Sequence, residues 1–241
     1  SLLSSNRQQT RAASPRDYGL PSSESFWKDM TGKGHDGTVD GATYQGGNIG
    51  VWNFDGSGSS VTSGPHIITS HSNDFDFGSV DFAIEAWCRP TNASVIDPSI
   101  VALWNFPDNK RSWGIFGNTG GSAATFDGSV RGTASPDGAF ATRTEITGTL
   151  ALNAWNHVVF TRISNTLNFF INGVSQGTAS YSTAVYSNTT DGVMIGAMGD
   201  AAESRNHFNG KIAQVRIYKA KGLTASEVLN NFNATRARFG V

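Results

Sequence analysis

The sequence predicts an all-β fold, an antiparallel two-sheet sandwich with one short helix near the C-terminus. The chain of 241 residues contains 28 glycines and 15 phenylalanines but only 15% charged residues, which suits many short strands joined by frequent turns. Several segments alternate in polarity with the period of two that strands have. Sandwiches of roughly 200 to 250 residues commonly form one unit, and no sharp shift in composition marks a second one. We therefore expect a single domain over residues 22–241.

Residues 152–173 carry most of this prediction because they read as a β-hairpin. Apolar side chains fall on both faces of its two expected strands, residues 155–162 and 167–172. Residues 164–166, Ser-Asn-Thr, supply the turn between them. The pair Asn172-Gly173 predicts a second tight turn, since both residues tolerate positive φ. Because both faces carry apolar residues, we expect the hairpin in the interior of a sheet.

Further strands are expected before and after the hairpin. Residues 81–89 alternate most clearly, with Phe82, Ile84, Ala86 and Cys88 on one face. Shorter strands are expected at residues 50–55, 100–106, 112–116, 123–126, 193–198 and 211–218.

Three segments are predicted to differ from regular strands. Residues 224–231 are expected to form the helix, because Thr224 and Glu227 have the spacing of a capping box, which satisfies free N–H groups of the first turn. Residues 129–138 are expected to be the least structured interior stretch. Residues 1–21 are polar and cannot fill a core, so we expect an arm that is disordered or that orders on a neighbouring subunit.

Composition and missing motifs exclude several classes of function. A formal net charge of −1 provides no long-range field that would attract nucleic acid. No apolar run approaches the ~20 residues that cross a bilayer, so we expect no membrane insertion. Cys88 is the only cysteine, which excludes an intrachain disulfide, and we expect it to be buried. Glycine-rich phosphate loops and the elbow of a nucleophilic serine are also absent.

Four segments, in this order, resemble one family. They are residues 81–87 (DFAIEAW), the hairpin from Trp155 to Gly173, residues 208–218 (FNGKIAQVRIY) and residues 223–228 (LTASEV). Together they are similar to the concanavalin A-like lectin/glucanase superfamily, in particular its laminin-G-like branch. The resemblance covers about residues 22–232 and implies a jelly-roll sandwich.

The catalytic pattern of that superfamily's glucanases is missing. A retaining enzyme needs two carboxylates about 5 to 5.5 Å apart, and the laminarinase-like members carry Glu-x-Asp-x-Glu on one strand. The glutamates here are too scattered for that pattern, and Asp81 is the only acidic residue close to Glu85 in sequence. We expect Glu85 to be a hydrogen-bonded strand residue and the protein not to be an enzyme.

Residues 230–240 also resemble the tail of such domains in structural proteins of marine bacteriophages. This implies a protein of the virion surface or the extracellular space, whose arm would contact other virion proteins or like subunits. Three functions stay open. The first is a capsid decoration, tail or fibre protein that binds host or environmental polysaccharide or is purely structural. The others are a free secreted carbohydrate-binding module and an endoglucanase.

Candidate glycan contacts are aromatic residues in or beside loops that also carry Asn and Asp. An exposed ring can stack on the apolar face of a sugar while nearby polar groups bond its hydroxyls. Two of the candidates, Trp104 and Trp113, could equally be core residues. The full set is Trp104, Asn105, Asp108, Trp113, Tyr181 and Tyr186.

Residues 26–37 lead from two aromatics into a loop punctuated by glycines. The stretch from Asp29 to Gly37 resembles a family loop in which Asp, Asn and backbone carbonyls can hold calcium, which prefers oxygen ligands. Asp29 and Asp36 are the candidate metal ligands. Lys33 stands where that pattern usually has Asn, and its ammonium would repel a cation. No cofactor is therefore required, and calcium remains an alternative to a loop turned only by glycines.

Overall fold

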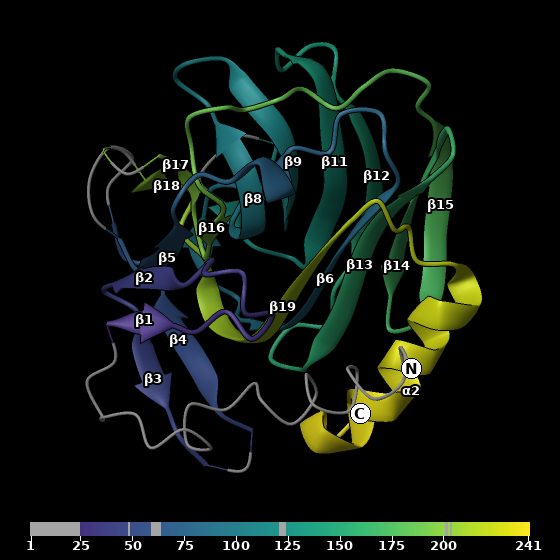
Figure 1. Cartoon of the computed structure of the whole chain (residues 1–241). Helices are drawn as coiled ribbons and strands as arrows, with labels where there is room; N and C mark the ends of the chain where they lie inside the picture. The colour runs from purple at the N-terminus through teal and green to yellow at the C-terminus, as the bar shows by residue number, and fades with distance from the viewer. Residues whose placement is uncertain (1–24, 48, 59–63, 121–123, 201, 203) are drawn as a thin grey trace.

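The structure is a computed structural model that describes residues 25–47, 49–58, 64–120, 124–200, 202 and 204–241. Two large antiparallel sheets lie face to face, and a helix packs outside them (Figure 1). The predicted sandwich is therefore confirmed. The arm expected over residues 1–21 lies outside the described residues.

The two sheets are formed by different strands, and each sheet combines strands that are far apart in sequence. Across the eight-stranded sheet the order is β1 (Phe26–Trp27), β2 (Gly37–Asp40), β5 (His66–Thr69), β16 (Met194–Ile195), β8 (Ser99–Asn105), β9 (Lys110–Gly117), β11 (Ser129–Gly138) and β12 (Thr144–Thr149). Across the seven-stranded sheet it is β15 (Val174–Ser180), β14 (Thr166–Ile171), β13 (Asn156–Ile163), β6 (Phe82–Pro90), β19 (Asn209–Lys219), β4 (Val51–Asp55) and β3 (Thr43–Gln45). Two short pairs accompany them, β7 (Ser94–Val95) with β10 (Ala124–Thr125) and β17 (Met198–Gly199) with β18 (Ser204–Arg205).

The strands expected from alternation are present, with ends shifted by one or two residues. The exception is residues 193–198, which are divided between β16 and β17. The core fills the space between the sheets, and Phe82 and Ile84 of β6 point into it. Phe77 lies parallel to Phe82 at 4.4 Å between ring centroids and stacks on Trp113 at 5.3 Å. Cys88 is buried in the same core, as expected.

β13 and β14 form the predicted hairpin, and both are interior strands of their sheet. On one face Val158 and Phe160 enter the core between the sheets. On the other face Val159 packs in a separate cluster against residues of the helix region. Asn172 and Gly173 adopt φ of 51° and 81°, which confirms the predicted turn after β14.

The expectation that residues 129–138 are irregular is wrong, because they form β11, paired with β9 and β12. Gly132 faces the core directly against Phe160, and a Cβ there would lie 2.4 Å from ring atom Cδ2. The small residues that suggest a loop are thus needed where rings of the opposite sheet approach the backbone. The register of β11 against β9 shifts between Ala134 and Gly138, around Pro136, which cannot donate to the ladder.

Helix α2 (Ala225–Phe239) starts as predicted but continues well beyond the expected end at Asn231. Thr224 caps it, and the reciprocal bonds of a capping box with Glu227 are both present. Residues three or four apart form the buried face, namely Val228, Phe232, Thr235 and Phe239. Figure 1 shows α2 along the outside of the seven-stranded sheet. Within the part of the chain that the structure describes, no helix is long and apolar enough to cross a membrane.

Aromatic and polar contacts hold α2 on the sheet. The indole of Trp87 on β6 stacks on Phe239 at 4.1 Å between centroids, and its Nε1 donates to Thr235 Oγ1 at 3.1 Å. One turn of the helix earlier, Asn231 Nδ2 donates to Glu85 Oε2 at 3.2 Å. Two neighbouring outward positions of β6 therefore fix the helix.

Glu85 is a fully buried carboxylate surrounded by donors from three elements. Its Oε1 accepts from His157 Nε2 of β13 at 2.8 Å and from Arg216 Nη1 of β19 at 3.1 Å. Its Oε2 accepts from Tyr218 Oη of β19 at 2.9 Å as well as from Asn231 of α2. The expectation that Glu85 is a hydrogen-bonded strand residue is confirmed.

Burial acts to raise the pKa of Glu85, but the hydrogen bond from His157 and the charge of Arg216 outweigh it and lower this pKa to about 2. The folded value is thus below the ordinary value of 4.5. Consequently the ionised carboxylate contributes stability above about pH 4.5, and this contribution is lost as the pH falls toward 2.

We expect Glu85→Gln to lower the free energy of unfolding at neutral pH by about 3 kcal/mol, because it leaves the largely buried Arg216 without its counter-ion. The loss of stability on acidification between pH 4.5 and 2 should also be smaller in this variant, since the responsible group no longer titrates. Urea unfolding monitored by tryptophan fluorescence measures both effects. Glu145→Gln is the control, because it breaks a partly exposed pair with Arg143 and should change stability by less than about 1 kcal/mol. Arg131, which lies 3.8 Å from Glu145, keeps Asp97 as its counter-ion at 2.9 Å in this variant. Similar losses in both variants would contradict this role of Glu85.

Candidate functional site

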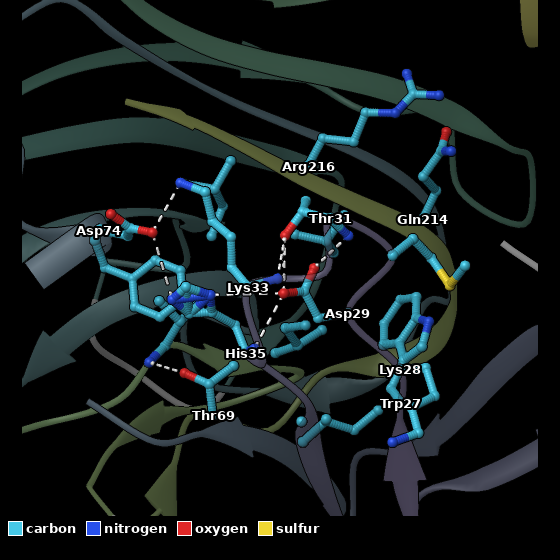
Figure 2. Close-up of a pocket in the computed structure, with 18 of the residues that line it drawn as sticks. Trp27, Lys28, Asp29, Thr31, Lys33, His35, Thr69, Asp74, Gln214 and Arg216 are labelled. Atoms are coloured by element: carbon cyan, nitrogen blue, oxygen red, sulfur yellow. Dashed lines mark hydrogen bonds and ion pairs between the residues drawn. The ribbon is translucent and has the colours of Figure 1, made fainter. Parts of the chain in front are cut away.

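A cleft of about 310 Å³ is lined by residues from both sheets. Its aliphatic floor comes from both sheets, with Ile67 of β5 and Ile195 of β16 on one side and Val215 and Ile217 of β19 on the other. Trp27 of β1, which is partly exposed, forms part of the wall. Figure 2 shows Trp27 and Lys28 toward one end of the cleft and Asp74, Lys33 and His35 toward the other.

The loop between β1 and β2 borders the cleft and is closed by Asp29. The carboxylate of Asp29 accepts from the backbone N–H and the hydroxyl of Thr31, at 2.8 and 2.9 Å, and from the backbone N–H of His35 at 3.0 Å. Gly32 and Gly34 have φ of 78° and 80°, a conformation that glycine adopts without strain. These hydrogen bonds therefore fold a short glycine-rich sequence back on itself.

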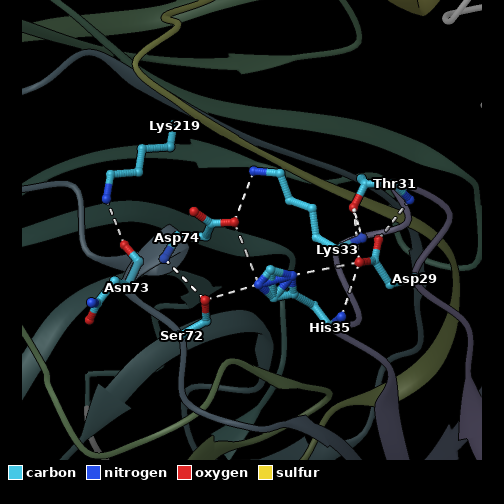
Figure 3. Close-up of polar contacts among 8 residues, drawn as sticks. All are labelled: Asp29, Thr31, Lys33, His35, Ser72, Asn73, Asp74 and Lys219. Atoms are coloured by element: carbon cyan, nitrogen blue, oxygen red, sulfur yellow. Dashed lines mark hydrogen bonds and ion pairs between the residues drawn. The ribbon is translucent and has the colours of Figure 1, made fainter.

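The same loop docks onto a 3-10 turn, η2 (Asn73–Phe75), some forty residues later. Lys33 Nζ lies 2.8 Å from Asp74 Oδ2, and His35 Nε2 lies 2.9 Å from Ser72 Oγ. Lys219, at the end of β19, donates to the carbonyl of Asn73 at 2.6 Å. Figure 3 shows these contacts, which form one polar frame from three segments far apart in sequence.

Hydrogen bonds lower the pKa of the carboxylates in the frame. For Asp74 the main cause is the hydrogen bond from Lys33. For Asp29, burial acts to raise the pKa, and hydrogen bonds from the backbone of Thr31 and His35 more than offset it. Both groups are therefore ionised at neutral pH, and each has a cation or an imidazole nearby. The frame is polar without a large excess of either charge.

The loop does not fit a calcium ion as it stands. Asp29 is occupied by the donors just described, and Asp36 accepts from the backbone N–H of Asp29 at 2.8 Å and from Lys28 Nζ at 2.5 Å. An ammonium on one candidate ligand would repel a divalent cation, and Lys33 adds another positive charge. Among the described residues, no group of three or more His, Cys, Asp or Glu side chains is placed to hold a metal.

Three of the aromatic residues considered for glycan binding lie inside the protein. Trp113 has no exposed surface, and its Nε1 donates to the carbonyl of Phe75 at 3.0 Å. Tyr181 belongs to the same central core. Trp104 faces outward from β8 but is covered, because it packs in a small cluster with Phe116 and Met198.

The remaining candidates lie at or near the β8–β9 turn. Asn105 is buried and donates to the carboxylates of Asp191 and Asp200, at 3.1 and 2.9 Å. Asp108 is exposed and pairs with Lys110 at 3.1 Å. Tyr186 is partly exposed, and its backbone bonds to β9 and β11. None of the six candidates lines the cleft.

Of the residues that line the cleft, the sequence singled out only Asp29, as a candidate metal ligand, and not as part of a glycan site. The pair of aromatics before the glycine-rich loop was a usable signal for Trp27. The pairing of Lys33 with Asp74 had no signal, because only the fold brings these residues together.

Residues 55–229 match a family model described as the concanavalin A-like lectin/glucanases superfamily. Among curated proteins, no sequence matches the chain. Solved structures do match. The binding domain of Paraclostridial Mosquitocidal Protein 1 has a TM-score of 0.66 at 20% identity, and the alignment covers 90% of this chain and 51% of that one.

Two further matching structures come from proteins that interact with glycans. That of botulinum neurotoxin type C, a toxin whose cell entry depends on interaction with two ganglioside molecules, has a TM-score of 0.66 at 15% identity and covers 89% of this chain and 50% of its own. Domain 4 of AbnA, a GH43 extracellular arabinanase from Geobacillus stearothermophilus in complex with arabinotriose, has a TM-score of 0.59 at 16% identity, with 84% and 90% covered. The chain thus spans about half the length of the toxin domains, and these identities show a shared fold.

We expect calcium at about 10 mM, well above the ~1 mM dissociation constants of weak extracellular sites, to leave Tm unchanged. The reason is that Lys28, Thr31 and His35 already occupy the carboxylates. Differential scanning fluorimetry with calcium and with a chelator measures this. A calcium-dependent rise of about 3 °C that Asp29→Asn abolishes would contradict the expectation.

Proposed function

The chain belongs to the concanavalin A-like lectin/glucanase superfamily, and we propose that it is a lectin-like domain that binds a carbohydrate without cleaving it. The observation that carries this proposal is the cleft between the sheets, which combines an aliphatic floor, a tryptophan wall and a polar frame. Two structural relatives add support, since one was solved with arabinotriose and the other is a toxin that depends on gangliosides for cell entry.

The cleft has the chemistry that a sugar needs. A sugar ring has an apolar C–H face, which an exposed indole and aliphatic side chains can cover, and a rim of hydroxyls that charged side chains can bond. At about 310 Å³ the cleft is at the lower end of the ~300–1,000 Å³ range of small-ligand sites, which suits a short oligosaccharide. Because Lys33 pairs with Asp74 and Lys28 with Asp36, we propose an uncharged saccharide.

Binding without hydrolysis is supported by the state of the carboxylates. A glycosidase acid requires a raised pKa in order to hold its proton. The pKa values of Asp29 and Asp74 are instead lowered, and Glu85 is buried beneath α2 without access to a substrate.

We propose the virion surface or the extracellular space as the setting of this domain. The support is the resemblance of residues 230–240 to marine bacteriophage structural proteins. Most of that segment is the second half of α2, where Phe232 and Phe239 seal the outer face of a sheet. Within this setting we favour a capsid decoration, tail or fibre protein that binds glycans. A free secreted module is the alternative.

We expect Trp27→Ala to weaken the binding of a neutral oligosaccharide at least about tenfold, or about 1.4 kcal/mol, because stacking on the indole is lost. Calorimetric titration with arabinotriose, followed by a glycan array of neutral oligosaccharides, measures this. Lys33→Ala changes an exposed residue of the polar frame and should also weaken binding. Because this exposed side chain is not part of the core, this second variant tests the site even if Trp27→Ala has a folding defect.

Phe26→Ala is the matched control for this experiment. Phe26 is 50% exposed, is adjacent to Trp27 and does not line the cleft. It should bind as the unchanged protein does. Absence of neutral oligosaccharide binding on the array, or equal losses in the Phe26 and Trp27 variants, would overturn the proposed site.

We also expect no reducing ends to be released from laminarin or arabinan on prolonged incubation. The cleft offers two ionised carboxylates and no proton donor with a raised pKa among its described aspartates. A reducing-sugar assay measures this, with Asp74→Asn as the comparison. Release that this variant abolishes would show that the protein is an enzyme.

A further inference from the structure

Two turns at one end of the eight-stranded sheet present a second cluster of side chains. They connect β8 to β9 and β11 to β12, and Arg111 of β9 lies between them, paired in register with Gly138 of β11. The cluster consists of two half-exposed phenylalanines and three arginines. We name it the arginine–phenylalanine patch, with the members Phe106, Arg111, Phe140, Arg143 and Arg205.

Arg111 is a buried cation without a counter-ion. Its Nη1 donates to Asn109 Oδ1 and to the carbonyl of Gly138, at 2.6 and 3.0 Å, and its Nη2 donates to the carbonyl of Phe106 at 2.8 Å. These partners are all neutral, and within the described ranges no carboxylate lies in ion-pair distance of Arg111. Its Nε is buried and unpartnered among the described residues.

The charge that acts on the pKa of Arg111 is that of another cation. Burial and the charge of Arg143 both lower the pKa of Arg111, and no carboxylate offsets them. Three carboxylates lie on or beside these turns, and each already has partners. Glu145 pairs with Arg143 at 2.8 Å and Asp108 with Lys110 at 3.1 Å. Asp137 accepts from Thr142 Oγ1 at 2.5 Å and from the backbone N–H of Ala139 at 2.9 Å. A buried charge without a counter-charge is unfavourable, and an anion docked at this point would relieve it.

The phenylalanines provide apolar surface beside the arginines, on which the C–H face of a ligand would rest. Phe106 and Phe140 are 48% and 46% exposed. The guanidinium carbon of Arg111 is 5.0 Å from the ring centroid of Phe106, and that of Arg143 is 3.6 Å from the centroid of Phe140. Cations thus lie against aromatic rings whose remaining surface is open to a ligand.

We propose that the arginine–phenylalanine patch binds a saccharide that carries carboxylates, with a sugar face on Phe106 or Phe140 and a carboxylate toward Arg111 and Arg143. An acidic peptide offers the charge without the flat C–H face, and a neutral saccharide offers the face without the charge. This inference rests on the proposed function, because it takes the ligand to be a saccharide, but the patch shares no residue with the cleft.

Calorimetric titration with an oligogalacturonate tests the patch, with its carboxyl-reduced, uncharged counterpart as the ligand control. We expect the protein to bind the uronate at least about tenfold more tightly than the reduced form, and added salt to reduce this preference. The double variant Phe106→Ala/Phe140→Ala should lose binding of the uronate at least about tenfold. Phe26→Ala, an equally exposed phenylalanine outside the patch, should retain it.

Two single variants test the role of charge, because they are expected to change uronate binding in opposite directions. Arg143→Gln should weaken uronate binding, and Glu145→Gln should strengthen it, because each removes one member of the same ion pair. A purely structural role for this pair would give changes of the same sign.

The outcomes separate this proposal from the one on the cleft. Loss of uronate binding in the phenylalanine double variant, with binding kept in Trp27→Ala, supports the patch. The patch is overturned if the uronate does not bind, if only Trp27→Ala affects it, or if oligoglutamate of equal charge binds as tightly. In the first two cases, neutral oligosaccharide binding that depends on Trp27 would leave the proposed function in place.

Discussion

The buried carboxylate of Glu85 is the interaction on which the rest of the arrangement depends. It joins β6 to both neighbouring strands and to α2, and it has a donor for each hydrogen bond that its burial demands. The consequence extends to the cleft. Because Arg216 and Tyr218 of β19 must face outward to reach Glu85, alternation turns Val215 and Ile217 inward, where they form the floor of the cleft. The network around Glu85 therefore holds α2 on the outer face of the seven-stranded sheet. It also determines which residues of β19 face the cleft.

The elements of the fold that could be predicted from the sequence are those whose pattern lies within a few neighbouring residues. Alternation in β6 and the Asn172-Gly173 turn are properties of a few neighbouring residues, and both were predicted correctly. β11 was not, because Gly132 signals a turn in isolation and its reason for being small is the ring of Phe160 in the opposite sheet. The end of α2 was missed for a similar reason, since the residues that hold it pack on Trp87 rather than on each other.

The candidate site was less predictable than the fold. Period-two alternation shows which side chains share a face, but it does not show what covers that face. Trp104 does point away from the central core, yet Met198 and Phe116 cover it, so its exposure could not be inferred from its own strand. The polar frame of the cleft joins Lys33, Asp74 and Lys219, which have no common pattern in sequence. A site role for Trp27 could have been predicted, because aromatic residues that precede a glycine-rich loop lie at the edge of a sheet.

The distribution of charge distinguishes the two proposed saccharide sites. Helix α2 covers the outer face of the seven-stranded sheet, and the two proposed sites lie elsewhere, in the cleft between the sheets and at the turns at one end of the other sheet. In the cleft Lys33 and Asp74 neutralise one another, so hydroxyl groups are the matching ligand chemistry. On the arginine–phenylalanine patch, Arg111 donates to carbonyls, which are neutral, so among the described residues its charge is uncompensated. Both sites can cover a sugar ring with aromatic surface, and the unpaired charge selects which sugar remains bound.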